Sequence, residues 1–153
     1  MGLVLYQFHF LWYIIINHKG ENNKMKYEKS CGCIIIDNGK VLLVKQTSGD
    51  WGFPKGHVEN NETEIETAIR ETKEETNIDV EIDEKHRYSI EYSPKENVWK
   101  EAVYYIAKTK SDTCIPQESE IEKIEWLAFE EAVSKLTYDN TKEILKQVIE
   151  DLK

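Results

Sequence analysis

Short runs of apolar, β-branched residues alternate with turn-forming residues in the first third of the chain. The runs at residues 30–36 and 40–46 flank Asp37-Asn38-Gly39, a sequence that favours a tight hairpin turn. A shorter run at residues 51–53 leads into Pro54-Lys55-Gly56, where proline and glycine predict a turn. The pattern therefore predicts two paired strands and a short third strand ahead of any helix.

A helical period of apolar residues follows this turn and extends over residues 64–76. One side of the predicted helix carries the residues that can pack on a sheet: Ile65, Ala68, Ile69 and Thr72. Asn61 or Thr63 can serve as the N-cap, because both side chains accept hydrogen bonds from the first turn. Asn77 stands where a helix needs a left-handed residue, a conformation that asparagine tolerates.

The second half of the chain again shows strand-like and helix-like patterns of apolar residues. Strands are predicted at residues 80–82, 87–92, 100–108 and 123–127, and amphipathic helices at 129–136 and 141–152. The last helix has one apolar stripe, which we assign to the core. Strands, a helix, more strands and then helices predict an α/β fold in which a mixed sheet lies between helices.

Length and charge limit the classes of function. The chain has 153 residues, 40% hydrophobic and 32% charged, with a formal net charge of −9. These values predict a soluble globular domain, and an acidic surface disfavours stable binding to a nucleic-acid backbone. A phosphorylated substrate remains compatible if metal cations bridge the two anions. Cys31, Cys33 and Cys114 offer no paired framework, so we expect free thiols in the cytoplasm.

The first 24 residues differ from the rest. The apolar stretch 3–16 is interrupted by Gln7 and His9, is short for a membrane span and lacks a preceding lysine or arginine. Met25 could be the true start of translation, while a weak membrane anchor or an added strand stays open. We therefore treat residues 1–24 as an extension of unsettled role and residues 25–153 as one domain. No membrane partner is expected, and the sequence does not predict an oligomeric state.

Three glutamates of the predicted helix 64–76 gather on one side. Glu71, Glu74 and Glu75 are neighbours because residues three and four apart lie on one face. Such like-charge pairs destabilise an isolated helix by about 0.2–0.5 kcal/mol each. A solvated acidic face is the ordinary explanation. Clustered carboxylate oxygens are also the ligands that Mg²⁺ or Mn²⁺ prefers, with phosphate oxygens completing the shell.

The spacing of residues around these glutamates decides between the two explanations. It resembles the Nudix box, G-x5-E-x7-R-E-U-x-E-E-x-G-U, in which U is a bulky apolar residue. The residues in register are Gly56, Glu62, Arg70, Glu71, Glu74, Glu75 and Ile78. Thr72 stands at the first U and Asn77 at the second glycine, so the departures affect helix packing more than chemistry. The resemblance implies a Nudix-type α/β/α sandwich.

Similarity to this family also implies roles for the box residues. Glu74 and Glu75 would be the main ligands of Mg²⁺ or Mn²⁺, and Glu71 a further ligand or the base that activates water. Arg70 would pair with Glu62 and orient the loop that begins at Gly56. The metals would lower the pKa of bound water and neutralise the leaving phosphate, so that water splits a P–O–P bond.

Segments outside the box resemble one particular group within the family. Residues 51–59, 70–76 and 126–132 are similar to the asymmetrical diadenosine tetraphosphate hydrolases, which release ATP and AMP. Residues 100–105 resemble that group's K-x-x-x-Y stretch, and this likeness implies that Lys100 contacts phosphate and Tyr104 stacks an adenine. Residues four apart also share a strand face. Tyr138 matches a second aromatic position of the group. Each also has a structural alternative: a packed core tyrosine, or a solvated lysine at a strand edge.

Four further side chains are candidates near the same site. Glu120 falls where family members often have an additional metal-binding glutamate on a loop; Glu118 competes for this role, and a solvated acid is an equal alternative. Lys55 and His57 flank Gly56, and either could touch phosphate, although a turn histidine is more often a hydrogen-bonded surface residue.

The leading expectation is therefore a Mg²⁺-dependent hydrolase of dinucleoside polyphosphates, with a nucleotide as its partner. A nucleoside triphosphate pyrophosphatase or an RNA 5′-end pyrophosphohydrolase would use the same site, but RNA would require a basic track that the composition does not suggest. A nucleotide sensor without turnover is the third alternative. It is disfavoured because Glu71, Glu74 and Glu75 are all present.

Overall fold

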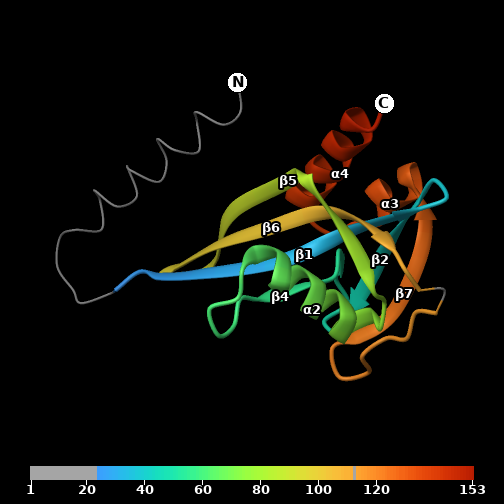
Figure 1. Cartoon of the computed structure of the whole chain (residues 1–153). Coiled ribbons are helices and arrows are strands. Elements are labelled where there is room, and N and C mark those ends of the chain that lie inside the picture. The colour runs from blue at the N-terminus through green and yellow to red at the C-terminus, as the bar shows by residue number, and fades with distance from the viewer. Residues whose placement is uncertain (1–23, 112) are drawn as a thin grey trace.

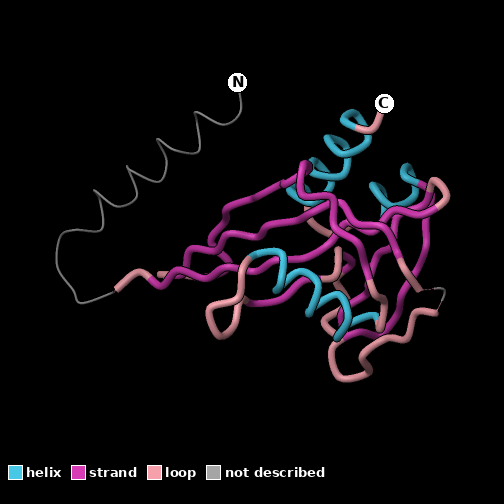
Figure 2. Tube along the Cα trace, viewed as in Figure 1, coloured by secondary structure: helices cyan, strands magenta, loops and turns pink. Residues whose placement is uncertain are grey.

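The computed structural model describes residues 24–111 and 113–153, which form a sheet between two layers of helices (Figure 1). The strands are β1 (Lys26–Asp37), β2 (Lys40–Gln46), β3 (Trp51–Gly52), β4 (Lys55–His57), β5 (Val80–Lys95), β6 (Val98–Thr109) and β7 (Ile121–Ala128). The helices are α2 (Glu64–Thr76), α3 (Phe129–Lys135) and α4 (Asp139–Asp151). Figure 2 shows how strands fill the centre while helices cover it. The α/β fold predicted from the sequence is confirmed.

The sheet is mixed. Its order is β3-β2-β1-β6-β5, with β4 paired to β1 and β7 paired to β2. Strands β1 and β6 run parallel, whereas the other pairs are antiparallel. One edge of β1 follows β6 from Lys26 to Ile35, and β4 takes the other edge at residues 30–32. Strand β2 joins that same edge only at Ile36 and Asp37.

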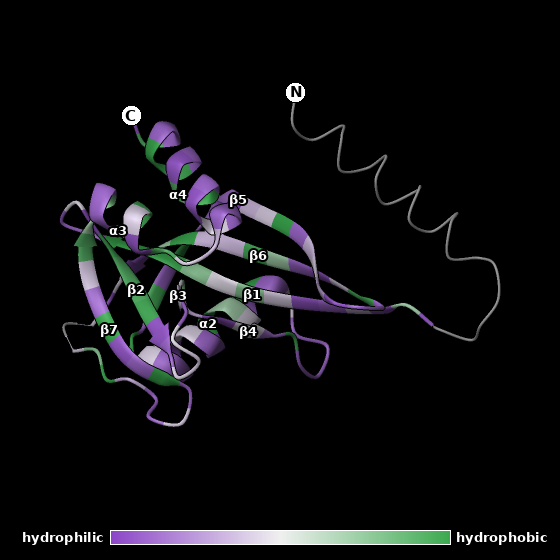
Figure 3. Cartoon of the chain, turned by 180° about the vertical axis from the view of Figure 1, so that it is seen from behind, coloured by the Kyte–Doolittle hydropathy of each residue, from purple (hydrophilic) through white to green (hydrophobic). Residues whose placement is uncertain are grey.

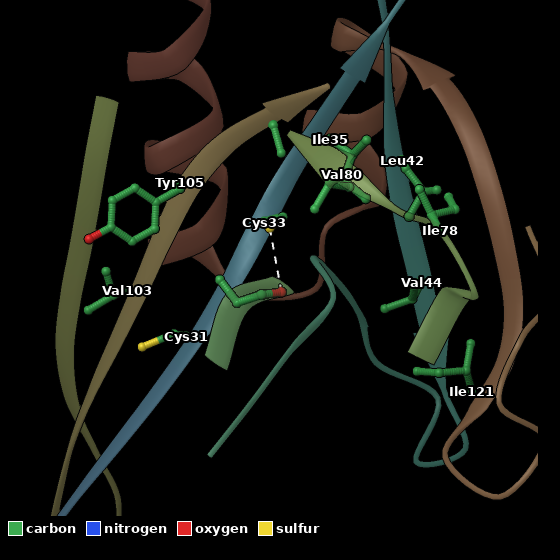
Figure 4. Packing of buried hydrophobic residues seen from close by; sticks show 12 residues of the cluster. Cys31, Cys33, Ile35, Leu42, Val44, Ile78, Val80, Val103, Tyr105 and Ile121 are labelled. Atoms are coloured by element: carbon green, nitrogen blue, oxygen red, sulfur yellow. Dashed lines mark hydrogen bonds between the residues drawn. The ribbon is translucent and has the colours of Figure 1, made fainter. Parts of the chain in front are cut away.

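Each face of the sheet has its own hydrophobic core. Side chains alternate along β1, so Cys31, Cys33 and Ile35 face α2 while Ile34 faces α3 and α4. Figure 4 shows the α2 side, where a dashed line marks the hydrogen bond that Cys33 Sγ donates to a helix carbonyl. Figure 3, seen from behind, shows α3 and α4 over the opposite face. The sheet therefore fixes α2 independently of the two C-terminal helices.

Local sequence sets both ends of α2. Thr63 is the N-cap: its hydroxyl accepts from the Glu66 backbone N–H at 3.2 Å, and the Glu66 carboxylate accepts from the Thr63 N–H at 2.7 Å. Asn77 ends the helix in the left-handed conformation, with φ of 61°. Of the two predicted N-cap residues the structure selects Thr63, and the prediction for Asn77 is confirmed.

Three sequence predictions differ from the structure. The predicted turn at Pro54-Lys55-Gly56 contains the start of β4, because Lys55 and Gly56 pair with Gly32 and Cys31 of β1. The two strands predicted at 80–82 and 87–92 are parts of the single strand β5, whose register with β6 shifts between Asp83 and Arg87. Helix α4 begins at Asp139, two residues earlier than predicted.

The N-terminal prediction concerns residues 1–24, of which 1–23 lie outside the described part of the chain. Within the described ranges, none of the helices combines the length and the apolar content that crossing a membrane requires.

Candidate active site

A cavity of about 420 Å³ lies where β4, α2 and the loop before β7 meet. Most of the residues predicted to form the site line it: Lys55, Gly56, His57, Glu71, Glu74, Glu75, Lys100 and Glu120. The other predicted residues, Glu62, Arg70, Tyr104 and Tyr138, are not part of this lining. Ser30, the loop 46–48, Glu59 and Ile121 complete the lining. Carboxylates and ammonium groups therefore share one open space, although they come from distant parts of the sequence.

Arg70 connects the loop after β4 to the acidic face of α2. Its guanidinium donates to both carboxylate oxygens of Glu62, from Nε at 2.6 Å and from Nη2 at 3.0 Å. Nη1 donates to Glu71 at 2.8 Å and to Glu74 at 3.2 Å, and Nη2 also donates to the His57 carbonyl at 2.9 Å. The Arg70 guanidinium holds the pKa of the Glu62 carboxyl down at about 2. The ion pair expected between Arg70 and Glu62 is present in the described structure.

Gly56 and Glu71 lie in direct apposition. Gly56 is paired with Cys31 in the sheet, so its Cα faces α2. A β-carbon on Gly56 would overlap the Glu71 carboxylate. Any larger residue here would displace the Glu71 carboxylate, so glycine is favoured by close approach and not by an unusual φ angle.

Two of the three clustered glutamates are buried. Glu71 is 8% exposed and Glu75 is 4% exposed, whereas Glu74 is on the surface. Burial raises the pKa of the Glu75 carboxyl to about 8, and the charge of Glu71 adds to this effect. Burial also raises the pKa of Glu71 against the opposing influence of Arg70. Negative charge is therefore costly on this wall of the cavity until a cation relieves it.

The glutamate predicted on the loop before β7 lies near this pair. Glu120 lines the cavity, and its charge raises the pKa of both Glu71 and Glu75. Glu118 is exposed on the same loop and is not part of the cavity lining. The backbone of this loop is fixed by hydrogen bonds from Gln117 N–H to the Glu75 carbonyl, at 3.1 Å, and from Thr47 N–H to the Glu120 carbonyl, at 3.0 Å.

The donor set fits a hard divalent cation in chemistry and in charge. Glu71, Glu74, Glu75 and Glu120 supply only carboxylate oxygens, the ligands that Mg²⁺ and Mn²⁺ prefer. Arg70 and the Lys55 N–H occupy some of these oxygens, the latter at 3.2 Å from Glu75 Oε2. In the described ranges, no three acidic, histidine or cysteine side chains are already placed to hold a metal ion together. Binding a metal would require these carboxylates to converge on one point of the cavity that they line.

Two lysines on the cavity wall lack a carboxylate partner. Among the described residues, neither Lys55 nor Lys100 forms an ion pair within 4 Å, and Lys100 is only 8% exposed. Burial lowers the pKa of both ammonium groups; the charges of Glu75 and Glu71 oppose this shift at Lys55, and the charge of Glu28 opposes it at Lys100. His57 lies 3.5 Å from Lys100 Nζ and 3.3 Å from Glu28. Lysines of limited exposure that no carboxylate contacts are suited to bind an incoming anion.

A second cavity of about 430 Å³ adjoins the first and shares Gln46 and Lys55 with it. Most of its large side chains are aromatic: Trp51, Phe53, Tyr92, Tyr104 and Tyr138. Tyr104 is 1% exposed and packs edge-on against Phe53, with ring centroids 5.3 Å apart. Tyr138 is 55% exposed and donates a hydrogen bond to Asp50 at 2.8 Å. The burial of Tyr104 agrees with the core alternative, although the residue also belongs to the cavity lining.

Neither Tyr92 nor Asp50 was among the residues predicted from the sequence. Tyr92 lies opposite Lys100 in the β5–β6 register, and Asp50 comes directly before β3. The alternation of Tyr88, Ile90 and Tyr92 indicated a shared strand face. Which strand would lie beside them depends on the long-range register, and that cannot be read from one sequence.

Comparison with known proteins agrees with this architecture. The NUDIX domain family model matches residues 26–151. The asymmetrical bis(5'-nucleosyl)-tetraphosphatase of Sus scrofa is 32% identical over 135 residues, covering 78% of this chain and 91% of that protein. The structure of a C. elegans Ap4A hydrolase binary complex has a TM-score of 0.74 at 29% identity, covering 82% of this chain and 97% of that chain. The m7GpppN-mRNA hydrolase of Saccharomyces cerevisiae is 34% identical over 121 residues, which are only 12% of its length.

Proposed function

The chain belongs to the Nudix hydrolase family, and from this premise we propose that it uses Mg²⁺ or Mn²⁺ to cleave dinucleoside polyphosphates. The most direct form of this activity is asymmetrical hydrolysis of diadenosine tetraphosphate to ATP and AMP. One observation carries the proposal: a single cavity is lined by two buried carboxylates, Glu71 and Glu75, and by two lysines, the buried Lys100 and the half-buried Lys55, whose side chains have no ion pair within the described residues. A polyphosphate with bound cations is complementary to both.

The carboxylates would hold the metal. Glu74 and Glu75 are the proposed main ligands, and Glu71 is a further ligand or the base that takes a proton from water. When bound, the divalent ions would lower the pKa of water and neutralise charge on the leaving phosphate. Arg70 keeps Glu71 beside Gly56 through its contacts with Glu62, so its role is to position the carboxylate.

The lysines and the second cavity would hold the substrate. Lys55 lines both cavities, so it can contact the phosphates of a substrate whose polyphosphate passes from one cavity to the other. Lys100 and His57 line the first cavity alone. An aromatic wall suits the face of a nucleobase, and stacking contributes about 1–3 kcal/mol per base. Tyr138 is exposed and Tyr92 is half-buried, so these two rings are the proposed stacking partners, whereas Tyr104 is buried.

Product analysis by chromatography tests the proposal. The protein is incubated with Mg²⁺ and, separately, diadenosine tetraphosphate, nucleoside triphosphates and triphosphorylated RNA. We expect equal amounts of ATP and AMP from the first substrate, no reaction with Glu75→Gln, and normal reaction with Glu66→Gln, an exposed glutamate of the same helix. Exclusive cleavage of triphosphates or RNA would replace the proposed substrate, and binding without any product would favour a sensor.

A further inference from the structure

The second cavity has a single carboxylate. Asp50 and Lys55 are the charged residues of its lining within the described ranges. The two differ in whether they also reach the first cavity. Lys55 also lines the cavity that holds the glutamates, whereas Asp50 lines the second cavity alone. A phosphate would be repelled by Asp50 and attracted by Lys55. A nucleotide would therefore direct its phosphates toward Lys55 and another part toward Asp50.

Two loops hold Asp50 in place. Tyr138 OH donates to Asp50 Oδ2 at 2.8 Å, and Ser48 Oγ donates to the same oxygen at 3.3 Å. Backbone contacts join the same two segments, because Trp51 N–H donates to Thr137 Oγ1 at 2.8 Å and Thr137 N–H donates to the Trp51 carbonyl at 3.2 Å. The orientation of the Asp50 carboxylate is thus fixed by contacts from two separate segments of the chain.

The other oxygen of this carboxylate is free to accept a hydrogen bond. Both protein donors contact Oδ2, and within the described residues none contacts Oδ1. An ionised carboxylate only accepts hydrogen bonds, so its partner in the cavity must carry an N–H or O–H group. One free acceptor beside an aromatic wall fits a base with an exocyclic amino group. Adenine has such a group at C6, whereas hypoxanthine has a carbonyl oxygen there.

We propose that Asp50 determines base specificity by accepting a hydrogen bond from the amino group of an adenine in the second cavity. The inference rests on the proposed function, since it requires a nucleotide substrate whose phosphates lie at Lys55. A carbonyl at the same position would bring two acceptors together. The site would therefore disfavour a hypoxanthine nucleotide, because a base seated as adenine is would set its C6 carbonyl against the Asp50 carboxylate, and only a shifted base could bring its N1–H to that oxygen.

The test compares kcat/KM for diadenosine and diinosine tetraphosphate. A site that hydrogen-bonds the amino group should favour the adenine substrate by at least about tenfold. Asp50→Asn keeps an acceptor for Tyr138 and can offer an amide N–H to a carbonyl, so it should shift the preference at least about tenfold toward hypoxanthine. Asp139→Asn, which changes a fully exposed aspartate next to Tyr138, should leave the preference unchanged.

Each other outcome overturns the inference in a distinguishable way. Equal rates on both substrates, unaffected by Asp50→Asn, would leave the proposed function standing and remove the role of Asp50. An equal loss on both substrates in Asp50→Asn would point to a contact with ribose instead of the base. No hydrolysis of either substrate by the unaltered protein would overturn the proposed function together with the inference.

Discussion

The carboxylate of Glu71 occupies the space that a side chain on Gly56 would need. The two residues come from neighbouring elements, β4 and α2, and the Arg70 guanidinium fixes the carboxylate at 2.8 Å. Strand pairing with β1 fixes the glycine. The strand and the helix therefore set the position of one acidic group jointly.

Gly56→Ala should lower activity much more than it lowers stability. The added methyl group meets the end of a flexible glutamate side chain, which can swing away while the backbone stays in place. Because a displacement of about 1 Å in a catalytic group can cost 10²-fold, we expect kcat to fall by at least about 100-fold. Steady-state kinetics and a thermal melt measure the two effects. Gly39→Asn serves as the control, since Gly39 has open space around it in a hairpin turn where asparagine is tolerated.

Arg70→Lys should lower activity although the charge is kept. Lysine cannot reproduce the two parallel hydrogen bonds to Glu62 and still reach Glu71. We expect a loss of about 10–100-fold in kcat, as is typical for groups that orient metal ligands. Arg87→Lys is the matched control because Arg87 also forms a two-pronged contact with a glutamate of α2, Glu64, outside the cavity lining. The control should lower the melting temperature and keep kcat; equal kcat losses would contradict the positioning role.

The buried carboxyl of Glu75 should make the metal-free protein less stable at high pH. Its pKa is about 8 in the folded chain and 4.5 in the unfolded chain. Between these values only the folded state holds the proton, so stability falls as the pH rises from 4.5 to 8. Glu75→Gln removes this loss, and with a chelator present we expect it to melt at least about 3 °C higher than the unaltered protein at high pH. The difference should vanish at acidic pH; a difference independent of pH would argue against a protonated Glu75.

Lys100→Gln should weaken substrate binding more than turnover. The ammonium group is buried and has no carboxylate within 4 Å in the described ranges, so phosphate would be its first close counter-ion. A charge-assisted hydrogen bond contributes about 1.5–3 kcal/mol, which corresponds to a rise in KM of about 10–100-fold. Lys108→Gln, an exposed lysine on the same strand, should leave KM unchanged. Equal KM values in the two variants would place the phosphates elsewhere.

Local patterns predicted α2 and most strands because their causes are local. The capping box at Thr63 and the left-handed Asn77 define the helix within a few residues of sequence. Strand β4 escaped prediction because its partner in β1 lies about 25 residues away, and its own three residues contain a glycine. The continuity of β5 was missed because charged residues at 83–87 interrupt the alternation beside a register shift.

In the candidate site as well, local contacts could be predicted from the sequence and long-range contacts could not. The box residues Arg70 and Glu62 pair as the resemblance implied, since their spacing is set within one loop and one helix. Tyr104 was expected at an adenine, but its burial depends on α3 and α4 covering that face of the sheet. Asp50 and Tyr138 are 88 residues apart in the sequence and touch in the fold. Only the tertiary structure brings such pairs together.

Titration with Mn²⁺ tests most directly whether the acidic face of α2 binds the divalent cation. The unaltered protein is compared with Glu71→Gln, Glu74→Gln and Glu75→Gln, and with Glu66→Gln on the capping turn as the control. If the three carboxylates bind the metal jointly, each of their variants should bind Mn²⁺ at least about tenfold more weakly, and the control should bind as tightly as the unaltered protein. Equal affinity in all five proteins would show that the metal, and with it the proposed chemistry, does not depend on these glutamates.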